Sequence, residues 1–442
     1  MAETKDQAVF KKAVSRRAFL AGSAAVGLAA VAGCAGGAPS SQAPAQTGTT
    51  ELYILKGLEG VEDQDNEFEA QAQAWGKEAK VKVKVERVAG KDVQPRVATA
   101  LQSKTGPDLL QIQANWAWLY ADSLVDVSDV AGEVEKNVGG FYQDQKANNF
   151  VKDKGWRAVP YQVIANAYAY RTDWFQQNSI TPPKTWDEFY ATGKKMKAFG
   201  KPYGQAHGHS QADPNCFFYP LLWCFGGKEV LEDGKTVAIN SPETLKAVEF
   251  AVALFNDVWA PGVLSWDDNS NNRAYPAEEI SCTLNGMSIY YVCRRDFPKI
   301  AAVTDHFPQC KGNAGPFQWN LQYSQAIPTY SKNASAAKDC IRYVMQPANY
   351  SKWLGVGGGY SSGCGLKHSE DPVWSKDPKS AAFRDAAKVG LWPGYPGVPN
   401  AAASDVLVRY IIIDLFAKPC SGELTPKDAV AWAENQLKAI YK

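Results

Sequence analysis

The sequence predicts an α/β protein whose parallel sheet begins near Glu51 and whose chain is long enough for two lobes. From that residue onward, strand-like and helix-like segments alternate in a βαβαβ order, which is typical of a parallel sheet. The chain has 442 residues, more than a single hydrophobic core usually serves. Alternation and length together predict the fold class.

The spacing of apolar residues assigns the first five elements. We expect strands at 51–57, 81–88 and 107–113, because apolar residues alternate there or form short runs. Helices are expected between them, at 68–80 and 92–103.

Three later helices carry start signals. Thr185, with Glu188 three residues later, forms a capping box. Ser241 and Thr425 are each followed by a proline, which suits the first position of a helix. These signals predict helices that begin near residues 186, 242 and 426.

The first 50 residues read as a leader and a tether. Arg16 and Arg17 precede a sixteen-residue apolar run, 18–33, which is shorter than the roughly 20 residues that span a membrane. Basic, apolar and small-residue regions in this order predict an export signal of the twin-arginine type, cleaved after residue 33. The stretch "VAGC" resembles a bacterial lipobox, which implies a lipid on Cys34. Residues 34–50 are rich in Gly, Pro, Ser and Thr and predict a flexible tether.

The number of cysteines does not decide whether disulfides form or which residues they join. Eight cysteines follow Cys34, an even number in an exported chain, so up to four disulfides are allowed. If the segment from Cys216 to Cys224 is helical, its two Cα atoms lie roughly 12 Å apart, too far for a disulfide.

Charge and motifs argue against several functional classes. The formal net charge is +1, which gives no reason to expect a nucleic-acid partner. His207 and His209 have no further ligand at supporting spacing, so we expect no metal site. Dinucleotide, P-loop and nucleophile-elbow motifs are absent from the sequence, so we expect no cofactor and no enzyme; a glycoside hydrolase is the alternative left open.

Six segments resemble the extracellular solute-binding proteins (family 1) that serve ABC importers, the group that includes maltose-binding proteins. They are "GPDLLQIQANWAWLYADSLVDVSD" (106–129), "AVPYQVIANAYAYRTDWF" with "PPKTWDEF" (158–189), "VAINSPETLKAVEF" (237–250), "LNGMSIYY" (284–291), "SQAIPTYSKNASAAKDCIRYVM" (324–345) and "GELTPKDAVAWAENQLKAI" (422–440).

This resemblance implies a two-lobed periplasmic-binding-protein-like fold with a ligand cleft between the lobes. Lobe 1 would combine 51–162 with 304–350, and lobe 2 would combine 163–303 with 351–442. The chain would cross between them near 160–167 and 303–307. Hinge closure would trap a solute and present it to an ABC permease. We therefore expect a monomeric, exported protein, held at the outer face of the membrane by lipidated Cys34.

Aromatic and amide residues predict a carbohydrate as the solute. The chain has 14 Trp, 20 Tyr and 18 Phe, and sugars stack on aromatic rings while amides and carboxylates bond their hydroxyl groups. Asn115 and Trp116 follow a strand, where ligands dock in open α/β sheets. The resemblance implies further candidates at positions that match the pocket of the family, namely Tyr161, Trp319, Asn320, Tyr360 and Trp392. Polar loops add His209, Trp266 and Asp267.

The chain also departs from the maltose-binding pattern. Ser288 stands where that pattern has a stacking tryptophan, and Ile164 where it has a carboxylate. A maltodextrin held in the same way is therefore not expected, and other sugars, polyols, sugar phosphates, ferric iron and small anions stay open. A phosphate would need basic side chains, for which we name Lys56, Arg273 and Arg294.

Overall fold

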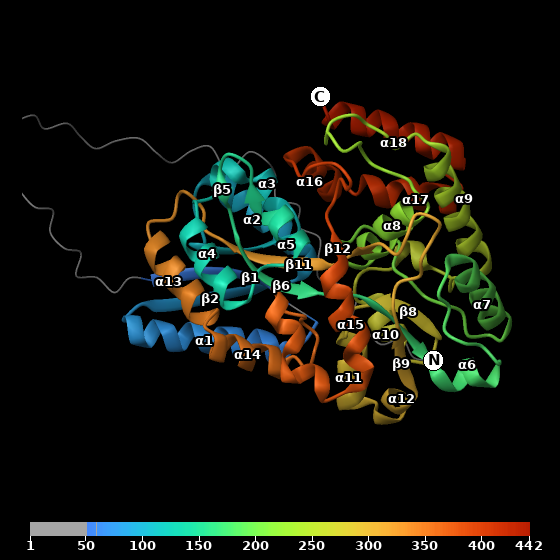
Figure 1. Cartoon of the computed structure of the whole chain (residues 1–442), viewed down its shortest axis with the longest axis horizontal. Coiled ribbons are helices and arrows are strands. Elements are labelled where there is room, and N and C mark those ends of the chain that lie inside the picture. Colours follow the sequence, from blue (N-terminus) through green and yellow to red (C-terminus); the bar gives the residue numbers. More distant parts are fainter. Residues whose placement is uncertain (1–50, 59) are drawn as a thin grey trace, which may run out of the picture. The chain divides into compact units, whose positions relative to one another are not determined.

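The computed structural model describes residues 51–58 and 60–442. The predicted signal residues Arg16 and Arg17, and the predicted lipid site Cys34, lie outside the described residues. The described chain contains a five-stranded sheet and a three-stranded sheet, each covered by its own helices (Figure 1). The predicted α/β class is confirmed.

The five-stranded sheet has the order β2-β1-β3-β11-β6. Its strands are β1 (Glu51–Gly57), β2 (Lys82–Val88), β3 (Leu109–Gln113), β6 (Val159–Ile164) and β11 (Leu321–Ala326). β1 pairs in parallel with β2 and β3, whereas β11 is antiparallel to β3 and β6. The predicted βαβαβ start is confirmed, with α1 (Glu62–Ala79) and α2 (Gly90–Ser103) as its two helices.

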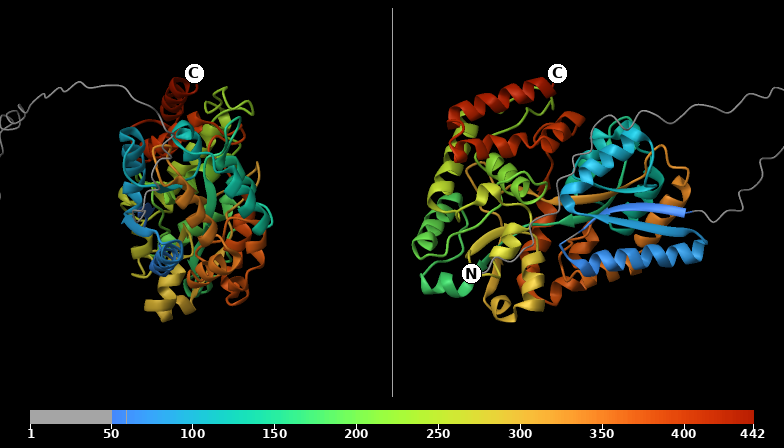
Figure 2. Two further views of the ribbon diagram at one scale, coloured as in Figure 1. Left: turned by 90° about the vertical axis from the view of Figure 1, so that its left-hand side faces the viewer. Right: turned by 180° about the vertical axis from the view of Figure 1, so that it is seen from behind.

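Helices bury both faces of this sheet. On one face, α1 lies beside α13 (Ala334–Val344) and α14 (Pro347–Val356), and the core there includes Leu52, Phe68 and Trp353. On the other face, α2 and the short α3 (Trp116–Leu119) cover Leu55 and Ile112. Figure 2 shows α1, in blue, running along the first two strands.

The three-stranded sheet has the order β8-β7-β9 and forms the centre of the second lobe. It consists of β7 (Ala167–Arg171), β8 (Cys282–Asn285) and β9 (Thr304–Phe307), and both pairs are antiparallel. Its large aromatic core packs against α7 (Trp186–Ala198), α8 (Asp213–Cys224), α9 (Pro242–Asp257), α17 (Ile411–Ser421) and α18 (Pro426–Ile440).

The three predicted helix starts are confirmed. Thr185 and Glu188 form a reciprocal capping box at α7. The side chain of Ser241 accepts from the Thr244 amide at α9, and Thr425 accepts from the Asp428 amide at α18. Local sequence therefore sets where these helices begin.

Shorter elements complete the described chain. They are α4 (Ser128–Asn137), α5 (Gln143–Asn149), β4 (Phe150–Val151), β5 (Gly155–Trp156), α6 (Thr172–Gln177), α10 (Ser270–Ala274), α11 (Ser288–Asp296), α12 (Pro298–Ala302), β10 (Gln318–Trp319), α15 (Ala381–Ala386), β12 (Gly390–Leu391) and α16 (Ala401–Val408).

The chain passes between the two sheets at β6 and again at β11. Only Ala165 and Asn166 separate β6 from β7, within the predicted first crossing at 160–167. The second crossing was expected at 303–307, but those residues include β9, which pairs with β7, so the return to the five-stranded sheet begins at Leu321. Helix α14 runs past residue 350 to Val356 while packed on α1. The remaining lobe limits stay a prediction.

All eight cysteines of the described chain are buried and free. Cys216 and Cys224 lie in helix α8, as expected from their spacing. Within the described residues, no helix has the length and apolar character needed to span a membrane.

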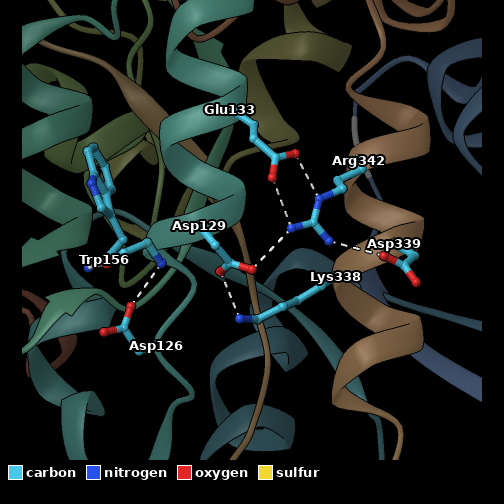
Figure 3. Close-up of polar contacts among 8 residues, drawn as sticks. Asp126, Asp129, Glu133, Trp156, Lys338, Asp339 and Arg342 are labelled. Carbon is cyan, nitrogen blue, oxygen red and sulfur yellow. Dashed lines mark hydrogen bonds and ion pairs between the residues drawn. The ribbon is translucent and has the colours of Figure 1, made fainter.

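An ion-pair cluster joins α4 to α13 on the first lobe (Figure 3). Arg342 donates to Glu133 at 2.8 Å, to Asp129 at 3.0 Å and to Asp339 at 3.0 Å. Lys338 adds a 2.7 Å contact to Asp129. Because one guanidinium donates to three carboxylates, the cluster is a network rather than an isolated surface pair.

Arg342→Gln tests this network. We expect the substitution to lower the free energy of unfolding by about 1 kcal/mol at low salt, and by less at high salt, because the pairs are partly exposed. The matched control is Arg295→Gln, whose exposed partner Asp296 is its neighbour in sequence. Denaturant unfolding measures both, and an equal loss in the two variants would contradict the network.

Candidate binding site between the two sheets

The site begins where the parallel strands β1 and β3 end at the same edge of their sheet. The Gly57 amide donates to Gln111 Oε1 at 2.8 Å, which ties these two strand ends together. Beyond them, the chain continues as the loop that contains Gly60 and as the turn at Ala114 and Asn115. Such an edge is the usual ligand position in open α/β sheets.

The loop after β1 contacts residues of the second lobe. The Gly60 amide donates to Tyr360 Oη at 3.2 Å. A Cβ atom at Gly60 would lie 3.0 Å from Ser288 Cβ and 3.1 Å from Tyr360 Oη, so only glycine allows this approach without a shift. The backbone near Tyr360 is held in turn, because the Ser362 amide donates to the Val163 carbonyl at 2.8 Å.

Three neutral polar residues form what we call the amide cluster: Asn272, Asn285 and Ser288. Asn285 Nδ2 donates to Asn272 Oδ1 at 2.8 Å, and Ser288 Oγ donates to Asn285 Oδ1 at 3.2 Å. Asn285 and Ser288 are buried. Each amide has two N–H donors and two acceptor lone pairs, so these bonds leave capacity for a ligand.

Asn115 contributes a buried amide from the end of β3. It is fully buried, and neither of its amide atoms has a hydrogen-bond partner among the described residues. Helix α16 lies over it, because Ser404 Oγ donates to the Asn115 carbonyl at 2.8 Å. The preceding residue, Ala114, has φ of 42°, a conformation that residues other than glycine rarely adopt. Strain of this kind persists where surrounding structure fixes the backbone, as at ligand sites.

Two of the predicted site residues thus lie at the end of β3, and a third contacts the loop after β1. Trp116 is buried beside Asn115, and its Nε1 has no partner among the described residues. Tyr360 contacts Gly60 across the lobes.

Three other predicted residues lie in the interior. Tyr161 packs against Trp353 at 4.6 Å between ring centroids, inside the first lobe. Trp319 is 1% exposed in the core, and Asn320 Nδ2 donates to the Ala386 carbonyl at 3.1 Å. Their roles in binding stay a prediction.

The last four predicted residues lie on loops of the second lobe. His209 stacks on Tyr410 at 4.6 Å and contacts Asp414 at 2.6 Å. Asp267 is exposed and accepts from Ser270 Oγ at 2.8 Å. Trp266 is half-buried and lies beside Gly204. Trp392 Nε1 donates to the Gly397 carbonyl at 2.9 Å.

Asn272 and Asn285 were not named from the sequence. Asn272 follows the polar loop that contains Trp266, and Asn285 ends the strand before Gly286. The sequence did hold a signal at each position: Asn285 is an amide at a strand end, and Asn272 belongs to an amide-rich loop. Their contact, however, joins residues 13 apart and depends on the fold.

A second buried polar group surrounds Asp144 on α5. Its carboxylate accepts from the Gln145 amide at 2.8 Å and from Gln322 Nε2 on β11. Asn148 Nδ2 donates to Gln322 Oε1 at 2.6 Å. A Cβ atom at Gly390 would collide with the Asp144 carboxylate, so the backbone of β12 also lies close to this carboxylate. Burial raises the pKa of Asp144 to about 7, and the hydrogen bonds oppose that rise.

No cluster of three or more His, Cys, Asp or Glu side chains that could hold a metal ion occurs in the part of the chain that the structure describes. The fully buried His207 packs against Phe218, and burial lowers its pKa to about 3. It is therefore neutral at physiological pH.

The sequence matches the family described as bacterial extracellular solute-binding protein over residues 67–382. This chain belongs to that family. The diacetylchitobiose-binding protein DasA of Streptomyces coelicolor is 27% identical to this binding protein over 192 residues, which span 42% of each chain. The match thus covers less than half of that relative.

Solved structures share the fold of this binding protein. Maltose-bound MalE3 of T. maritima superimposes with a TM-score of 0.78 at 20% identity, over 88% of this chain and 100% of its own. A sugar transporter from Arthrobacter chlorophenolicus A6 with bound laminaribiose gives 0.76 at 15% identity, over 89% and 100%. The predicted two-lobed solute-binding fold is confirmed.

Asp144→Asn tests the buried carboxyl group. In the folded chain Asp144 keeps its proton up to about pH 7, whereas its ordinary pKa is 3.8. Between these values the folded state binds more protons, so its contribution to the free energy of unfolding falls as pH rises from about 4 to about 7. Relative to wild type, the variant should gain stability over that interval, by at most about 4 kcal/mol. Denaturant unfolding at pH 4 to 8 measures the difference.

The matched control is Asp233→Asn. Hydrogen bonds from Thr236 and from the Lys235 amide hold the pKa of Asp233 near 2. Its stabilising contribution is present above its ordinary pKa of 3.8 and is lost only as pH falls toward 2, so this variant should show a constant difference from wild type above pH 5. A constant difference for Asp144→Asn as well would contradict its raised pKa.

Proposed function

We propose that this protein captures a carbohydrate between its two lobes and delivers it to an ABC permease by hinge closure. The observation that carries the proposal is the neutral, buried amide cluster beside Tyr360 and Gly60. Sugar hydroxyl groups donate and accept hydrogen bonds at once, and asparagine amides offer both functions from one planar group. Tyr360 adds an aromatic ring, and aromatic rings are typical of sugar sites.

Family membership supports a binding role over catalysis. Relatives and structural neighbours are described as binding or transport proteins, and the ligands in their names include maltose, laminaribiose and diacetylchitobiose. We therefore propose that the chain binds its solute without converting it. Release of a reducing end from any glycoside would contradict this part of the proposal.

The N-terminal sequence supports an exported, lipid-anchored protein. We propose that Arg16 and Arg17 direct export, that cleavage follows residue 33, and that a lipid on Cys34 retains a monomer beside its permease. Tethering raises the local concentration of the receptor at the permease.

Asn285→Ala tests the amide cluster directly. We expect affinity for the bound sugar to fall about tenfold or more, because the change removes ligand bonds and the 2.8 Å bond that orients Asn272. Asn240→Ala is the matched control, since Asn240 is exposed and its side chain donates to Glu434 Oε2 at 2.7 Å. Calorimetric titration with maltose, laminaribiose, cellobiose and diacetylchitobiose measures both variants and wild type.

The carbohydrate proposal fails if no member of a broad sugar and polyol panel binds, or if ferric iron or a small anion stabilises the chain instead. A true ligand raises the melting temperature as its concentration rises above Kd. Equal affinity in Asn285→Ala and wild type would place the site elsewhere.

Cys34→Ser tests the anchor. Without the thiol no thioether to lipid forms, so the protein should move from the membrane fraction to the soluble fraction of cells. Fractionation followed by immunodetection measures the change. Membrane retention of the variant would contradict lipidation at Cys34.

A further inference from the structure

We propose that the site takes an uncharged, hydroxyl-rich ligand and discriminates against phosphorylated and acidic sugars. This inference rests on the proposed function and narrows it. It follows from three properties of the described residues: the candidate phosphate-binding cations are already paired, two carboxyl groups near the amide cluster supply no positive charge, and the polar atoms without partners at the edge of β3 include acceptors.

The candidate cations are engaged within the protein. Lys56 Nζ lies 2.8 Å from Asp65 Oδ1, and both side chains are 1% exposed. Breaking such a buried pair to bind a phosphate would leave the Asp65 carboxylate buried without its cation, which is strongly unfavourable.

The two arginines are also paired. Arg294 lies 3.4 Å from Asp377 and stacks on Tyr290 at 5.2 Å from the ring centroid. Arg273 lies 3.8 Å from Asp267 and is 69% exposed, so solvent screens its charge. None of the three cations named from the sequence offers a bidentate phosphate contact that is free of a carboxylate.

Two carboxyl groups of the second lobe, Asp213 and Asp268, lie near the amide cluster, and Asn272 Nδ2 donates to the Asp268 carbonyl at 3.4 Å. Asp268 Oδ1 accepts from Ser210 Oγ at 2.6 Å and from the Asp213 amide at 2.9 Å. Asp213 Oδ2 accepts from Asn271 Nδ2 at 2.7 Å, next to Asn272 of the amide cluster. Burial is the main cause that raises the pKa of both carboxyl groups, which favours their protonated, neutral form. Neither group supplies a positive charge with which to hold a phosphate or a carboxylate.

The atoms without partners need a donor as well as an acceptor. Asn115 Oδ1 and Gln113 Oε1 are buried acceptors at the end of β3, and Asn115 Nδ2 and Trp116 Nε1 are buried donors; none has a hydrogen-bond partner among the residues described. A hydroxyl group satisfies both kinds. An ionised phosphate or carboxylate only accepts, so it would leave the two acceptors unsatisfied.

Titration of the purified full chain tests the inference. The probes are neutral sugars and polyols, namely glucose, maltose, cellobiose and ribitol, and their charged counterparts glucose 6-phosphate, glucuronate, cellobionate and glycerol 3-phosphate. We expect the tightest neutral ligand to bind about 100-fold or more tightly than its anionic counterpart. We also expect its Kd to change less than about twofold between low and high salt, because no net charge is screened.

Outcomes of the panel separate this inference from the proposed function. An anionic sugar that binds as tightly as its neutral form, or an affinity that falls steeply with salt, overturns the uncharged-ligand inference and leaves carbohydrate capture intact. If no sugar or polyol binds, neutral or anionic, both are overturned. The panel uses the unmodified chain, so it does not depend on any variant folding.

Asn115→Asp sharpens the test. The substitution keeps the size of the side chain, removes its donor and adds a negative charge, so affinity for the neutral ligand should fall tenfold or more. Asn240→Asp, at the exposed position used above, is the charge-matched control and should change Kd less than about twofold. If Asn115→Asp does not fold, Gln113→Glu makes the equivalent change on β3. Unchanged affinity in a folded variant at either position overturns the assignment of these atoms to the site.

Discussion

The hydrogen bond from the Gly60 amide to Tyr360 joins residues 300 positions apart and brings the two lobes together at the candidate site. Glycine suits this position, because a Cβ atom there would lie 3.0 Å from Ser288 Cβ and 3.1 Å from Tyr360 Oη and would force both to shift. The loop that holds Gly60 starts at the end of β1, and Asn115 starts at the end of β3. Since parallel strands end at one edge, this loop and Asn115 lie at the same edge of the sheet.

Burial of neutral polar groups at this junction costs stability unless something satisfies them. A buried amide without a partner costs about 1–3 kcal/mol. The Asn115 amide has no such partner, whereas the amide cluster meets part of its own hydrogen-bonding capacity through the bond from Asn285 to Asn272. A hydroxyl-rich ligand would supply the missing hydrogen-bond partners. Binding would therefore remove the free-energy cost of burying these unpaired polar groups. Charged groups near the junction, by contrast, are paired within the protein, as Lys56 is with Asp65.

Sequence patterns predicted the parts of the fold that local physics decides. Strand 51–57 and the capping box at Thr185 were correct, because alternation and capping act within a few residues. The second crossing was placed at 303–307, yet those residues include a strand of the other sheet. A four-residue strand with the sequence TDHF carries no pattern that assigns it to one sheet, and only its partner distinguishes the two. Tyr161 shows the same limit for the site. An aromatic residue near a crossing serves the core as readily as a sugar, and here its ring packs on Trp353. The contact of Asn272 with Asn285 depends on the approach of two loops, which no local pattern encodes.

We propose that an uncharged sugar lies between the two sheets, against the amide cluster, Tyr360 and Asn115. A crystal structure of the protein with its tightest neutral sugar tests this most directly. We expect sugar hydroxyl groups within hydrogen-bond distance of Asn285 and of the Asn115 amide, with no basic side chain as the principal contact. A sugar bound away from the amide cluster and Asn115, or a ligand held mainly by Lys56, Arg273 or Arg294, would contradict it.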